Sequence, residues 1–127
     1  MTKSAVKSKQ FFAKSVLCGT QDTMTIIGFA DDPLESTQFL TASSFRSKLA
    51  EQEHDYTVKV DSDKCNAQNA FETLQLTTTS LEVAFTKSAR QKLGYASANI
   101  TFKELSPKRL EEIKNILAAI TGMRLDD

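Results

Sequence analysis

The feature that most constrains the fold of this chain is an amphipathic helix predicted near its C-terminus. Ser106 suits the N-cap, Pro107 suits the first helical position, where its missing N–H costs nothing, and Gly122 suits the C-terminal end. Leu105 and Leu110 occupy the two positions of a hydrophobic staple. An apolar stripe along one side of this helix is formed by Leu110, Ile113, Ile116, Leu117 and Ile120. Another element must cover this stripe.

The chain before this helix has the patterns of strands and turns. Strands are predicted at 11–18, 23–29, 37–42, 56–61, 70–76, 81–85 and 97–103. Turns at 19–22 and 77–80 make hairpins of the first two strands and of 70–76 with 81–85. Residues 86–93 predict a short helix ended by Gly94.

Two polar stretches are predicted to lie outside the strands. The run 61–69 has the composition of a loop, and 43–55 has room for one or two helical turns around Phe45 and Leu49. Because strands precede the last helix without β-α-β alternation, the expected fold class is α+β. We expect an antiparallel sheet of about six to seven strands, with the C-terminal helix packed on one face.

The length of 127 residues suits a single domain, 1–127, of which we expect residues 1–9 to be flexible. No apolar run has the length of a signal peptide core or a membrane span, so we expect a cytoplasmic protein that does not enter a membrane. Two cysteines without Cys-x-x-Cys spacing and one histidine predict a reduced protein that needs no metal or other cofactor.

The chain offers few groups for catalysis. His54 is the only histidine and lies in an acidic run, where a solvated surface position is the simpler interpretation. Cys18 and Cys65 have no neighbouring histidine that would activate a thiolate. Asp61 and Asp63 begin an acidic run that suggests a calcium loop, but the glycine such a loop needs at its sixth position is absent. We therefore expect no enzyme and no small-molecule substrate.

The net charge is zero, but its distribution is uneven. Between Asp22 and Asp63 there are nine acidic residues and three basic ones, a local net charge of −6. Nucleic-acid binding is disfavoured because it needs a concentrated basic face, whereas this segment suits a cationic protein partner. These acids could equally be a solvated surface. The candidate partner-binding residues are Asp31, Asp32, Glu35, Glu51, Glu53, Asp55, Asp61 and Asp63.

Several segments resemble a known family in their pattern and order. They are T-I-I-G-F-A-D-D at 25–32, Q-F-L-T at 38–41, Y-T-V-K-V-D at 56–61, F-E-T-L-Q-L-T-T-T-S-L-E-V-A-F at 71–85 and A-R-Q-K-L-G at 89–94. Together with the terminal strand and helix, this order is similar to the bacterial immunity protein 10 family over roughly residues 11–121. One departure is Q-N-A at 68–70, where we expect a glycine-rich turn in that family.

The resemblance implies an immunity protein, the antitoxin of a polymorphic or contact-dependent growth-inhibition toxin. Such a protein binds the C-terminal domain of its cognate toxin, here expected to be a cationic nuclease, and blocks its active site or substrate entry. An acidic inhibitor would meet a basic cleft with a favourable potential. The alternative is an intracellular adaptor or secretion chaperone, which would hold a client protein by a sheet edge or by the C-terminal helix.

Overall fold

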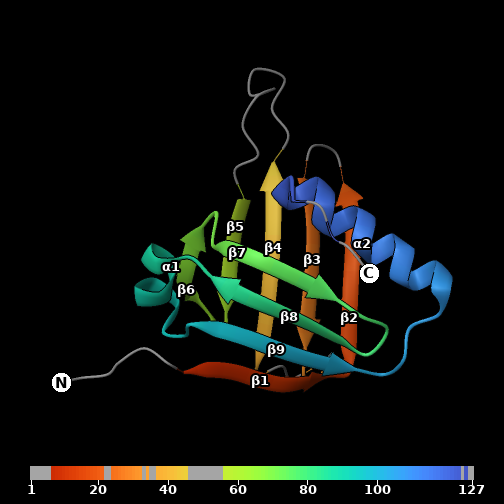
Figure 1. Cartoon of the computed structure of the whole chain (residues 1–127), viewed down its shortest axis with the longest axis horizontal. Helices are drawn as coiled ribbons and strands as arrows, with labels where there is room; N and C mark the ends of the chain where they lie inside the picture. The colour runs from red at the N-terminus through yellow and green to blue at the C-terminus, as the bar shows by residue number, and fades with distance from the viewer. Residues whose placement is uncertain are drawn as a thin grey trace.

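The structure is a computed structural model that describes residues 7–21, 24–32, 34, 37–45, 56–123 and 125, and these residues form nine strands and two helices (Figure 1). One sheet has the strand order β1 (Ser8–Ala13), β9 (Ser97–Phe102), β8 (Ser80–Phe85), β7 (Phe71–Leu76). The other has the order β2 (Ser15–Gln21), β3 (Met24–Ala30), β4 (Phe39–Phe45), β5 (Tyr56–Val60), β6 (Ser62–Gln68). The helices are α1 (Lys87–Leu93) and α2 (Pro107–Thr121). The α+β class is confirmed, but the single antiparallel sheet is wrong.

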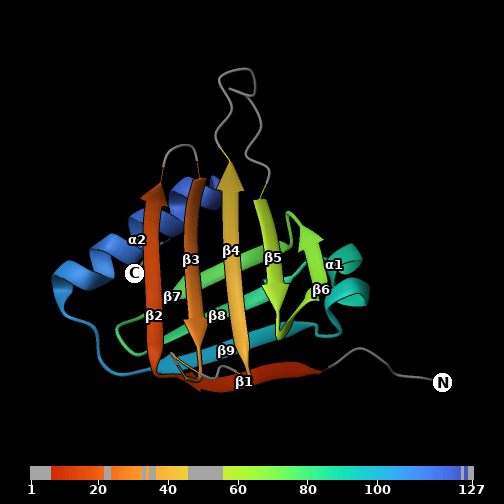
Figure 2. The ribbon, with the colours of Figure 1, turned by 180° about the vertical axis from the view of Figure 1, so that it is seen from behind.

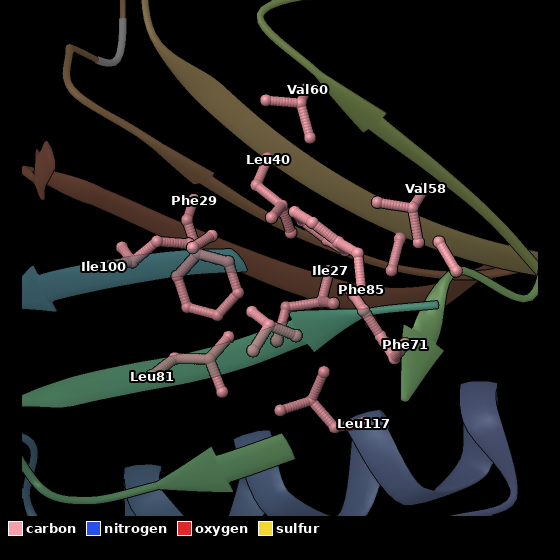
Figure 3. Packing of buried hydrophobic residues seen from close by; sticks show 14 of the residues in the cluster. Ile27, Phe29, Leu40, Val58, Val60, Phe71, Leu81, Phe85, Ile100 and Leu117 are labelled. Carbon is pink, nitrogen blue, oxygen red and sulfur yellow. The ribbon is translucent and has the colours of Figure 1, made fainter. Parts of the chain in front are cut away.

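The two sheets face each other, and their strands run in crossing directions (Figures 1 and 2). Their inner faces form the hydrophobic core between them, as the close view in Figure 3 shows. The rings of Phe29 from β3 and Phe102 from β9 stack across the interface with centroids 6.0 Å apart. This is the orthogonal arrangement, in which a strand that bends at a corner passes from one sheet to the other.

The chain makes that corner at Lys14, where a single strand over 11–18 was predicted. Phe11 and Ala13 are buried in β1, but the next side chains packed against the core are Val16 and Cys18. The alternation therefore shifts by one residue, because the chain leaves the four-stranded sheet and enters the five-stranded one. β1 pairs in parallel with β9, whereas β2 pairs antiparallel with β3.

Other segments differ from the expectations. Ser8 and Lys9, at the end of the segment 1–9 that was expected to be flexible, lie in β1. The predicted loop 61–69 is wrong because β6 pairs with β5 along one edge of the sheet, and polar residues suit an edge strand with one wet face. β4 extends to Phe45, into the stretch where helical turns were expected, while Leu49 lies outside the described residues.

The C-terminal half follows the predictions closely. Leu76 pairs with Leu81 in the β7–β8 hairpin. The Ser106 hydroxyl caps α2 by accepting a hydrogen bond from the Arg109 N–H, and Gly122 ends this helix with a φ of 74°. α2 lies in the same layer as the four-stranded sheet and packs mainly on β3, with smaller contacts to β2 and β4 (Figure 1). The core is thus enclosed by the five-stranded sheet on one side and by the four-stranded sheet with α2 on the other.

Candidate functional site

The eight candidate acids are described to different extents. The side chains of Asp31, Asp32 and Asp61 are described, and Asp63 lies in β6 without a described side chain. The other four lie outside the described residues: Glu35, Glu51, Glu53 and Asp55.

The three described acids lie at one end of the five-stranded sheet, which we call the acidic end. Here β3 ends at Ala30, opposite Phe39 at the start of β4, and β5 turns into β6 at Asp61. Residues 46–55 carry three of the remaining acids and are flanked by the opposite ends of β4 and β5, since Ser44 pairs with Tyr56. The two ends are about 20 Å apart, the length of a seven-residue strand.

Asp31 closes the connection between β3 and β4. Its carboxylate accepts hydrogen bonds from the Thr37 hydroxyl at 2.8 Å, the Thr37 N–H at 3.0 Å and the Gln38 N–H at 3.2 Å. Its own N–H donates to the Gln38 carbonyl at 3.0 Å. These bonds favour the ionised form, so the pKa of Asp31 is lowered, first by the Thr37 hydroxyl and next by the Gln38 N–H.

This lowered pKa predicts a pH dependence of folding stability. A carboxylate with a depressed folded-state pKa stabilises the fold above the ordinary aspartate pKa of about 3.9, and this contribution is lost as the pH falls through the folded-state pKa. We expect Asp31→Asn to unfold at a lower temperature than the wild type at pH 7 and to lose less stability between pH 5 and pH 2. Thermal unfolding across this range, with Glu104→Gln as the control, tests it. Parallel profiles for wild type and Asp31→Asn would contradict the role of the carboxylate.

Leu34 is presented to solvent from the same connection. The Leu34 N–H donates a hydrogen bond to the Asp32 carboxylate at 2.8 Å. The Leu34 side chain is 91% exposed. A side chain this exposed is available for burial against a partner, and the hydrogen bond from its own N–H to Asp32 reduces the backbone freedom that binding would cost. The sequence gives no signal that distinguishes Leu34 from the leucines of the core.

Asp61 has its main partner inside the protein. Its Oδ2 atom lies 2.8 Å from Nζ of Lys9, whose side chain is only 8% exposed. Lys9 also donates to Oε1 of Gln38 at 2.9 Å, and its Nζ lies 5.7 Å from the ring centroids of Phe11 and Tyr95. Asp61 thus compensates a buried cation, and the contact joins the two sheets.

No protein-family model matches this chain, and none of the curated proteins matches it. Among the described residues, no group of three or more His, Cys, Asp or Glu side chains could hold a metal ion. Within the same residues, neither helix is both long and apolar enough to cross a membrane.

The two cysteines of the described part are free thiols in partly buried positions. Cys18 lies on β2 with its Sγ atom 3.5 Å from Nη1 of Arg109, and Nη2 of the same guanidinium donates to the Val16 carbonyl. These contacts attach the first turn of α2 to the edge strand β2. Cys18 thus contributes to the packing between β2 and α2. His54 lies outside the described residues.

Other exposed apolar side chains lie on the outer faces of the sheets. Leu17, which is 69% exposed, and Ile26 lie on the outer face of the five-stranded sheet, the face turned to the viewer in Figure 2. Phe12, which is 51% exposed, lies on the outer face of β1. Single exposed apolar residues are common on protein surfaces. Leu34 differs from these three in its higher exposure and in the hydrogen bond from its N–H to the Asp32 side chain.

Proposed function

We propose that this protein is an immunity protein, which binds the toxic domain of a cognate bacterial toxin and blocks its active site or substrate entry. It acts in the cytoplasm and uses no catalysis of its own. The acidic end makes the central contact. Leu34 supplies the apolar part, and the neighbouring carboxylates provide a potential that favours a cationic toxin domain.

The observation that carries this proposal is the 91% exposure of Leu34, whose N–H donates a hydrogen bond to the Asp32 carboxylate. Asp31 supports this surface by accepting hydrogen bonds from the Thr37 and Gln38 N–H groups. Asp31 and Asp61 therefore act mainly by shaping the acidic end. Acids that lack such internal hydrogen bonds would supply the negative charge that attracts a cationic partner.

The direct test is protection from a toxin. The toxin domain encoded beside the gene of this protein is expressed in a sensitive host with and without the chain, and binding of the purified pair is measured by calorimetry. Restored growth together with a stoichiometric complex supports the proposal. A stable complex with a neighbouring protein that has no toxicity would assign the chain to the adaptor or chaperone class instead.

Leu34→Ala is expected to weaken the complex without changing the stability of the free protein. Burial of a leucine side chain contributes about 1.5–3 kcal/mol, which corresponds to roughly a tenfold to hundredfold rise in Kd. The matched control is Leu17→Ala, which removes an exposed leucine from the outer face of the five-stranded sheet. Equal affinities for wild type and Leu34→Ala would remove the acidic end from the interface.

A further inference from the structure

By the strand register, a row of polar side chains crosses the outer face of the four-stranded sheet. This face of the sheet is turned to the viewer in Figure 1. The strand register places Gln10 beside Asn99, and it places Glu82 beside Gln75. Asn99 and Glu82 are themselves paired, so the row is continuous over all four strands. We call these four residues the polar row.

Small side chains form the neighbouring row on the same face. Ser8 pairs with Ser97, and their hydroxyl oxygens lie 3.0 Å apart. Ala84 and Thr73 continue this row on β8 and β7. Because these side chains are shorter than those of the polar row, the surface sinks beside it into a shallow hollow of about 560 Å³.

The hollow offers hydrogen-bond acceptors and negative charge. Glu82 is exposed and makes no ion pair within the described part of the chain, and the residues lining the hollow include no lysine or arginine. The Oδ1 atom of Asn99 is buried and accepts no hydrogen bond from any described residue. Because the terminal torsion of an asparagine side chain is broad, rotation about it would let this oxygen accept from a donor in the hollow.

We propose that this hollow receives an arginine side chain of the partner protein. The inference rests on the proposed function, because it takes the partner to be a cationic toxin domain. A guanidinium group carries five donors in a planar fork and keeps its charge at all physiological pH values. Glu82 accepts the charge-assisted hydrogen bonds, and the amide oxygens of Asn99 and Gln75 accept the remaining ones.

The position of β1 connects this hollow with the acidic end. Lys9 of β1 points inward and bonds to Gln38 and Asp61, whereas the next residue, Gln10, lines the hollow. A single partner domain that covers Leu34 has the neighbouring edge of the four-stranded sheet within its reach.

Other ligand classes fit the hollow less well. A phosphate or another anion would meet an exposed carboxylate with no compensating cation among the lining residues. A sugar would use the amides, but the exposed Phe12 ring lines a smaller neighbouring depression, which shares Gln10 and Asn99 with the hollow, and does not line the hollow itself. Charge and the excess of acceptors therefore favour a cationic donor.

The test is an NMR titration of the full chain with N-acetylarginine amide, followed by backbone amide shifts. N-acetylcitrulline amide, the uncharged isostere of this probe, and methyl glucoside serve as comparison ligands. We expect shifts clustered on β1, β7, β8 and β9 with the arginine probe alone. Glu82→Gln should weaken this binding about tenfold, since charged hydrogen bonds are the strong ones. The control Glu104→Gln replaces an exposed glutamate outside the hollow and should leave binding unchanged.

Equal shifts with citrulline amide or with methyl glucoside, or no clustered shifts with the arginine probe, would overturn the arginine site. The result is separable from the test of function. A chain that protects against its toxin but shows no arginine binding would keep the proposed function and lose this site. A chain that binds the probe at Glu82 without protecting any host would keep the site and lose the proposed function.

Discussion

Replacing Leu117 with alanine is expected to lower the free energy of unfolding by about 2–5 kcal/mol, the range for a large-to-small change in a core. Leu117 is 1% exposed and lies on the face of α2 that packs against the five-stranded sheet (Figure 3). Ile116 is only partly buried on the same helix, so Ile116→Ala should cost clearly less. Urea denaturation of the two variants and the wild type measures both effects.

The comparison also decides between a structural helix and a binding helix. If the apolar stripe of α2 belonged to a partner interface, Leu117→Ala would weaken binding while leaving the urea midpoint unchanged. Burial of Ile113, Leu117 and Ile120 within the chain predicts the opposite result. A loss of stability with unchanged affinity of the folded fraction is the expected outcome.

Asp61→Asn is expected to cost about 3 kcal/mol of folding stability, because it leaves the buried Lys9 cation without its counter-charge. This figure is at the low end for a buried pair, since the Asp61 side chain remains 28% exposed. Asparagine keeps an oxygen for the Phe39 N–H and tolerates the positive φ of 63° at this position. Removal of the charge is therefore the main change.

A double-mutant cycle with Lys9→Met tests the origin of this cost. The variant carrying both substitutions should recover much of the stability, because no buried charge then lacks a partner. Glu112→Gln breaks an exposed ion pair with Arg109 and should cost less than about 1 kcal/mol. Additive losses for Lys9→Met and Asp61→Asn would show that the two residues act independently.

The parts of the fold that the sequence predicts well are those in which local signals and burial agree. The β7–β8 hairpin has alternating apolar residues on both sides of a polar turn, and these residues face each other as expected. The helix α2 has its own cap residues at Ser106 and Gly122. Such elements are specified by residues near each other in the chain, so a pattern suffices to find them.

The parts that the sequence misses depend on how strands pair and how the two sheets pack. The polar strand β6 is a strand because β5 offers its edge, and its composition alone is that of a loop. The corner at Lys14 is marked only by a one-residue shift in the alternation of buried side chains. Alternate residues of a strand share a face, so Phe11 and Ala13 belong to one alternation and Val16 and Cys18 to another.

The candidate acids were found from charge, but their roles depend on neighbours that charge counting does not reveal. Asp31 is bound by Thr37 and Gln38, and Asp61 is bound by Lys9, a residue 52 positions away in an N-terminal segment that was expected to be flexible. Leu34 was missed because exposure of an apolar residue is decided by the fold. The missing information was therefore the side-chain contacts of the folded chain, which are local for Asp31 and join distant segments for Asp61.

The parallel pairing of β1 with β9 has a consequence for the order of events during synthesis. Ser8 and Ser97, which share a hydrogen bond, are 89 residues apart, so β1 leaves the ribosome long before its partner strand exists. The β2–β6 meander joins strands that follow one another in the sequence and is able to assemble while the chain is still growing. β1 reaches its final place only after β9 has been made, and the contact of Lys9 with Asp61 then closes the fold.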